Sequence, residues 1–132
     1  SERQPSGIYA PNLDDIERLA RAAIADLLPP FDAWLKGVVL HVADFAEDEV
    51  LADLGIESPF DLSGLYQGHS TARSVEVSGS LPDSIWLFRR PILDEWAETG
   101  EALEDLVTHI VVHEAGHHFG LSDDDIERIE RA

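Results

Sequence analysis

Residues 111–125 read VVHEAGHHFGLSDDD. Within this stretch, residues 113–118 hold three histidines and one glutamate, and residues 123–125 are all aspartates. Only three further histidines occur in the whole chain of 132 residues. Such a concentration of imidazole and carboxylate groups predicts a metal site, and the spacing of the groups predicts how the chain folds around it.

The segment that carries the first of these histidines is predicted to be a helix over residues 101–118. Its buried face is expected to carry Leu103, Leu106, Val107, Ile110 and Val111. His113 and His117 are four residues apart, so their rings rise from one face about one turn apart and can converge on a single Zn²⁺. Glu114 is rotated by about 100° around the helix axis, where it can reach a metal-bound water as a general base.

A catalytic zinc ion needs a third protein ligand, and helix geometry excludes the nearest candidate. His109 lies one turn before His113, but a straight helix separates residues 109 and 117 by about 12 Å, which is too far for all three histidines to meet at one ion. Gly120 can instead take the left-handed conformation that ends a helix, after which Asp123 can fold back. His113, His117 and Asp123 are therefore the predicted ligands, with a fourth position open. The two aspartates after Asp123 and His109 remain alternatives for the third ligand.

The metal site has to be weighed against a plainer interpretation, in which the histidines are merely polar and the aspartates begin an ordinary helix. Gly120 and Asp123 at fixed offsets from HExxH make a chance match rarer by about two orders of magnitude. Two histidines and one carboxylate suit Zn²⁺, one ion per chain, although the same triad can hold Fe²⁺. HExxH with its adjacent base favours zinc.

HEAGHHFGLSD at residues 113–123 matches HExxHxxGxxD, a variant of the metzincin signature in which aspartate is the third ligand. This block, together with GLYQG at residues 64–68 and SIWLFRRPI at residues 84–92, resembles a small bacterial family of minimal zincin-like zinc metallopeptidases. These blocks cover the second half of the chain. The resemblance implies an α+β fold: a single compact zincin-like domain with a small mixed sheet packed against helices, including the HExxH helix.

Carried over by position, the resemblance implies that His113, His117 and Asp123 bind zinc and that Glu114 is the base of a peptide-bond hydrolase. The sequence has no methionine and therefore lacks the methionine turn beneath the metzincin zinc. The short stretch after Asp123 also predicts that the lower subdomain and its substrate wall are missing. Two hypotheses follow: a zinc metallopeptidase in which water activated by Glu114 attacks a peptide carbonyl, and a catalytically idle module that binds a peptide or protein through the same cleft.

The remaining sequence predicts one domain over residues 1–132, with residues 1–11 flexible. Further helices are expected at residues 13–28, capped by Asn12 and stopped by Pro29 and Pro30, at 47–54, at 91–100, and from Ser122 onward with Asp125 completing a capping box. Strands are expected within residues 36–45, at 74–78 and at 84–88, and residues 56–71 are predicted to be a loop.

Several other residues near these elements have more than one interpretation. His118 is expected on the surface or beside the ligands, and His109 is expected to be a plain helix residue. Tyr66, in the predicted loop, could border the cleft and stabilise an oxyanion. Arg89 is expected to form a salt bridge. Residues 84–88 are apolar on both faces, which predicts a buried strand or, alternatively, a sheet edge that pairs with a peptide.

Composition limits the partners. Twenty-seven acidic against nine basic residues give a net charge of −18, which repels nucleic acid and anionic membranes. The same charge attracts cations and basic peptides, although solubility alone also accounts for it. The absence of cysteine excludes disulfides, thiolate metal sites and cysteine nucleophiles. Neither the apolar core of a signal peptide nor a long apolar run is found, so a cytoplasmic location is expected. The substrate and the oligomeric state stay open.

Overall fold

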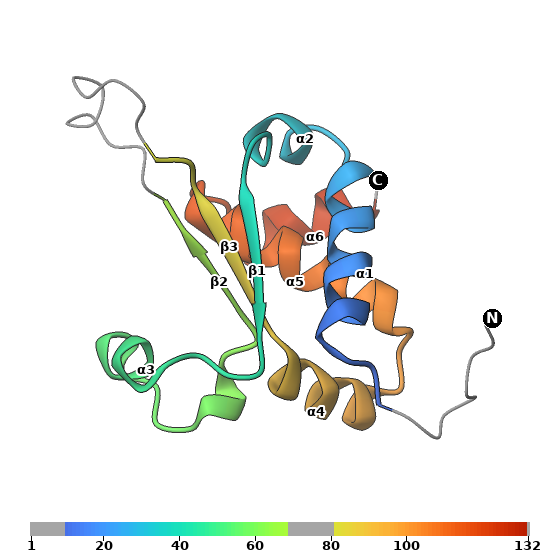
Figure 1. Cartoon of the computed structure of the whole chain (residues 1–132). Coiled ribbons are helices and arrows are strands. Elements are labelled where there is room, and N and C mark those ends of the chain that lie inside the picture. Colours follow the sequence, from blue (N-terminus) through green and yellow to red (C-terminus); the bar gives the residue numbers. More distant parts are fainter. Residues whose placement is uncertain (1–9, 69–80, 132) are drawn as a thin grey trace.

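A three-stranded mixed sheet packs against a layer of helices, and a short helix covers part of its other face (Figure 1). The computed structural model describes residues 10–68 and 81–131. Its strands are β1 (Val39–Ala43), β2 (Gly64–Gln67) and β3 (Ser84–Phe88), in the order β1-β3-β2. β3 runs parallel to β1 and antiparallel to β2. This arrangement confirms the expected α+β fold with a small mixed sheet.

Helices precede, connect and follow these strands in the sequence. They are α1 (Leu13–Ala25), α2 (Phe31–Trp34), α3 (Asp48–Leu54), the 3₁₀ helix η1 (Pro59–Asp61), α4 (Arg89–Thr99), α5 (Leu103–His118) and α6 (Asp123–Arg131). α1 packs against both α5 and β1, while α5 also packs against β2 and α6. Within the described residues, no helix is both long enough and apolar enough to cross a membrane.

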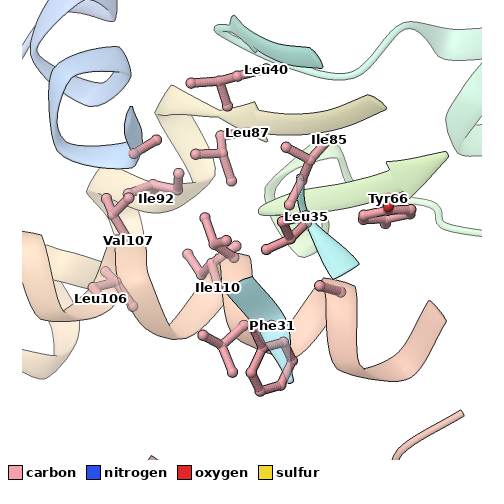
Figure 2. Packing of buried hydrophobic residues seen from close by; sticks show 14 of the residues in the cluster. Phe31, Leu35, Leu40, Tyr66, Ile85, Leu87, Ile92, Leu106, Val107 and Ile110 are labelled. Carbon is pink, nitrogen blue, oxygen red and sulfur yellow. The ribbon is translucent and has the colours of Figure 1, made fainter. Parts of the chain in front are cut away.

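The main core lies between the central strand and α5. Ile85 and Leu87 of β3 are fully buried and point toward Ile110 of α5 (Figure 2). Since successive side chains of a strand point to opposite faces, Trp86 and Phe88 face away from α5. Phe88 is buried there in a second cluster, which also contains Leu51 of α3. Both faces of β3 are therefore covered, which confirms the buried strand predicted from its sequence.

The alternative interpretation of β3, as a sheet edge open to a peptide, is wrong. β3 is hydrogen-bonded on both sides, with Ile85 opposite Leu40 of β1 and opposite Tyr66 of β2. A strand whose backbone groups are paired on both sides has no free donors or acceptors for a further strand. Within the described sheet, the outer positions belong to β1 and β2.

Most predicted helices are found, with shifts at their ends. Asn12 caps α1 through a reciprocal capping box with Asp15. The helix ends at Ala25 rather than residue 28, because the residue before Pro29 is restricted to extended conformations. α4 begins at Arg89, two residues before Pro91, since a proline in the first turn of a helix removes no helical hydrogen bond.

The prediction of a loop over residues 56–71 is wrong, because the range contains η1 and β2. The short β2 segment has little strand propensity of its own and is a strand because it pairs with β3. The predicted strand at residues 74–78 and most of the segment predicted to be flexible, residues 1–9, lie outside the described residues. Arg89 forms the expected salt bridge, with Asp44 at 3.1 Å.

Candidate metal centre

α5 places two histidines side by side on an accessible face. The ring centroids of His113 and His117 are 4.4 Å apart, with the ring planes at 76° to each other. Val111 and Ala115, each two residues before one of the histidines, are fully buried and hold the opposite face of α5 in the core. The helical spacing thus produces the paired imidazoles that the sequence predicts, with side chains 34% and 44% exposed.

The chain reverses direction immediately after α5. Gly120 has a φ of 93°, in the left-handed region that residues with a Cβ rarely adopt. Its N–H donates to the carbonyl of His117 at 3.1 Å, and the N–H of Leu121 donates to the carbonyl of Gly116 at 2.8 Å. These bonds satisfy carbonyls at the end of α5. The predicted turn at Gly120 is confirmed.

A capping box then starts α6. The backbone N–H of Asp125 donates to Ser122 Oγ at 3.1 Å, and the N–H of Ser122 donates to the Asp125 carboxylate at 3.2 Å. The same carboxylate also contacts Arg128. Asp123 is therefore the first residue of α6, and Asp125 is committed to the cap rather than to the histidines.

The close packing of α6 on α5 depends on a glycine inside the HExxH motif. A Cβ placed at Gly116 would lie only 2.6 Å from Cδ1 of Ile126, which is 1% exposed. This role of Gly116 is not among those predicted from the sequence. A signal was present, because glycine in a helix interior costs about 1 kcal/mol relative to alanine and therefore calls for a structural reason.

The turn and the close packing bring Asp123 to both histidines. Its Oδ1 lies 2.7 Å from His117 Nε2 and 3.8 Å from His113 Nε2. The potential ligand atoms of the three residues all lie within 4.8 Å of one another, and the described residues contain no other such group. Ligand atoms around a tetrahedral zinc are about 3.3 Å apart. Small side-chain adjustments would therefore let this donor set hold Zn²⁺ with one position left open.

The surroundings of His113 favour the neutral imidazole that a metal requires. Burial lowers its pKa from the ordinary histidine value, and repulsion between its charged form and the neighbouring imidazoles of His117 and His109 lowers it further. Asp123 and Glu130 act in the opposite direction. Because a ligating nitrogen must be unprotonated, the net lowering prepares His113 for metal binding.

Glu114 is partly buried beneath β2. Burial raises the pKa of its carboxyl, while the charge of His117 lowers it. A Cβ at Gly64 would lie 3.3 Å from Cγ of Glu114 and 2.8 Å from Cγ2 of Ile110, so only a glycine lets the strand pass this close to α5. A carboxylate made more basic by burial is suited to accept a proton.

The other candidate side chains have partners of their own. His109 Nδ1 lies 3.1 Å from Glu130 Oε1, and His109 is not part of the three-residue group. His118 stacks on Tyr66 with ring centroids 4.3 Å apart. Tyr66 lies on β2 rather than in a loop, and its hydroxyl donates to Asp83 at 2.8 Å. Burial and the contact with Asp83 raise the pKa of Tyr66, so the hydroxyl is held as a donor to Asp83.

A family model described as zincin-like metallopeptidase matches residues 35–132. The chain belongs to this family. No curated protein matches it. In this zincin-like protein the matched range contains the whole sheet, α5 and α6, whereas α1 lies before it. The family membership and the grouping of His113, His117 and Asp123 confirm the resemblance drawn from the sequence.

Replacing the aspartate tests the third ligand. Asp123→Ala is expected to weaken zinc binding at least about tenfold, because one of three protein ligands is lost. Asp124→Ala is the matched control, since it removes the same charge one residue further along α6. Zinc affinity is measured by competition with a chromophoric chelator. Unchanged affinity in Asp123→Ala, or equal losses in both variants, would show that Asp123 is not the ligand.

Gly116→Ala tests whether helix packing positions the site. The added methyl overlaps Ile126 and is expected to displace α6 and its aspartate, weakening zinc binding about tenfold while circular dichroism shows α5 intact. The double variant Gly116→Ala with Ile126→Ala also shortens the side chain that the new methyl would overlap. It is expected to regain part of the zinc affinity. If Gly116→Ala binds zinc as the wild type does, the packing is not what places Asp123.

Proposed function

We propose that this zincin-like protein is a zinc-dependent metallopeptidase. His113, His117 and Asp123 would hold one Zn²⁺, and Glu114 would act as the general base. The observation that carries the proposal is the convergence of three potential ligand atoms within 4.8 Å, from the end of α5 and the start of α6, next to a partly buried glutamate. A merely polar helix face requires neither this turn nor this glutamate.

Bound zinc would supply a Lewis acid that polarises the peptide carbonyl and brings the pKa of water at the open position toward about 7. The protein's own contribution is proton transfer. Glu114 takes a proton from the attacking water and delivers it to the leaving amine. Its partial burial supports this role, because the raised pKa brings the carboxylate nearer to the basicity that proton transfer at neutral pH demands.

An extended peptide is the substrate that the surroundings of the site favour. β2 pairs with β3 on one side only among the described strands, so its other edge can accept hydrogen bonds from a peptide. Gly64 brings this strand into contact with the helix that carries Glu114. The net charge of −18 further favours peptides that carry basic side chains.

A second hypothesis is a catalytically idle module that binds a peptide in the same place. One observation favours it: the hydroxyl of Tyr66, the candidate for oxyanion stabilisation, donates instead to Asp83 at 2.8 Å. A hydrolase then relies on the metal alone to stabilise the developing negative charge. The partly buried Glu114 favours the enzyme, because metal binding alone does not require it.

Glu114→Gln separates the two hypotheses. The amide cannot accept a proton, so hydrolysis of the best peptide from a library is expected to fall about 10²–10⁴-fold. Zinc stoichiometry and peptide affinity are expected to stay unchanged, since the three ligands are untouched. Glu98→Gln, on the exposed face of α4, is the matched control and should retain full activity.

Both proteins are compared at equal zinc content. Equal slow turnover by wild type and Glu114→Gln would point to contaminating protease and contradict the peptidase. Peptide binding without turnover in either protein would support the idle module. Loss of zinc in Glu114→Gln would contradict the assignment of Glu114 to a position outside the ligand set.

Zinc affinity is expected to depend on pH through the two histidines. Protons compete with the metal for imidazole, so affinity should fall as pH drops below the ordinary histidine pKa of about 6.5. Because the pKa of His113 is lowered, protonation of His113 should reduce the zinc affinity only at a pH below the ordinary histidine pKa. Chelator competition from neutral pH down to about pH 5 measures the effect. Constant affinity over this range would show that carboxylates alone hold the ion.

A further inference from the structure

A second feature of the molecule lies away from the candidate metal centre. Between α1, α5 and α6, which lie together on one side of the sheet in Figure 1, there is a hollow of about 410 Å³. Its apolar lining includes Leu19, Ala22, Ala23, Leu27, Leu28 and Ile129, with the buried Phe31 and Val112 beneath them. None of the three metal-site residues lines it. α5 thus contributes to two separate surfaces, the histidine site and this hollow.

The rim of the hollow is acidic and its charge is largely uncompensated. Asp26, Glu104, Asp105 and Glu130 line it, and no lysine or arginine does. Glu130 contacts His109, but among the described residues no cation forms a salt bridge with the other three carboxylates. An apolar surface bordered by negative charge attracts a ligand that is both apolar and cationic.

The hollow continues along the molecule. Leu28 and Ile129 also line a neighbouring depression, together with Leu121 and Pro29. Leu28 is 59% exposed and lies between the two depressions. Arg128 borders the second depression, but its guanidinium contacts Asp125. The two depressions together form an elongated apolar surface, which is called the α1–α6 groove below.

We propose that the α1–α6 groove docks a basic amphipathic segment of a partner protein. Apolar side chains of the segment would cover the partly or largely exposed Leu19, Leu27 and Leu28. Lysines or arginines would face Asp26, Glu104 and Asp105. Charge complementarity favours this occupant over the others. A second copy of this chain carries the same net charge of −18, and anionic membranes and nucleic acid are repelled for the same reason. The docking surface is independent of metal binding and of the proposed hydrolysis.

The test uses the chain of residues 1–132 and a defined probe. The probe is a fluorescein-labelled peptide of about a dozen residues with leucines at helical spacing on one face and lysines on the other. Fluorescence anisotropy is expected to show saturable one-to-one binding that weakens with added salt. The amide signals that shift in NMR spectra should belong to the groove rather than to β2. Asp123→Ala and added chelator should leave the affinity unchanged, which separates this docking surface from the metal centre.

Matched variants distinguish the effect of the rim carboxylates on probe binding from the effect of the overall net charge. Asp26→Asn, Glu104→Gln and Asp105→Asn combined should weaken binding about fivefold or more. The control is Asp48→Asn, Glu49→Gln and Asp53→Asn combined, which removes three exposed charges from α3 and should have little effect. Ala22→Leu, which fills the hollow with a good helix former, should weaken binding at least about tenfold without lowering the thermal midpoint.

Each contrary result overturns the proposal. Equal weakening in the two charge-neutralised triple variants would mean that only the net charge attracts the probe. Full affinity in Ala22→Leu would show that the apolar hollow is not occupied. Concentration-dependent dimerisation that is lost in Ala22→Leu would assign the groove to a second copy of the chain. Loss of binding on zinc removal would show that the peptide binds at the candidate metal centre and not in the groove.

Discussion

The contact between Gly116 and Ile126 sets the distance between the last two helices, and the geometry of the candidate metal centre depends on it. With no side chain at Gly116, Ile126 can bury itself against the backbone of α5. α6 then starts close enough to α5 for Asp123 Oδ1 to lie 2.7 Å from His117 Nε2. The turn at Gly120 supplies the change of direction, and the isoleucine supplies the apolar burial that holds it.

α5 is the element on which the other features converge. Its buried face packs on the sheet through residues such as Ile110. A second face carries His113 and His117, and a third contributes Val112 to the α1–α6 groove. A single helix can serve three surfaces because its side chains point in all directions around the axis.

The features predicted correctly from the sequence are those that depend on residues close together in the chain. The pair His113 and His117, the turn at Gly120 and the reach of Asp123 all follow from helical spacing and from the conformation that glycine favours. β2 was missed because its stability comes from pairing with β3, which lies far along the chain. The roles of Gly64 and Gly116 were missed for the same reason, since each is defined by a side chain from another element.

The three potential donor residues of the candidate metal centre all fall within residues 113–123. Closing so short a loop around an ion costs little chain entropy, in contrast to sites assembled from distant segments. In the unfolded chain, the helical spacing and the Gly116–Ile126 packing that align the donors are lost, so zinc would bind the native state in preference and stabilise it. Bound zinc would therefore join the end of α5 to the start of α6 and oppose local unfolding of α6.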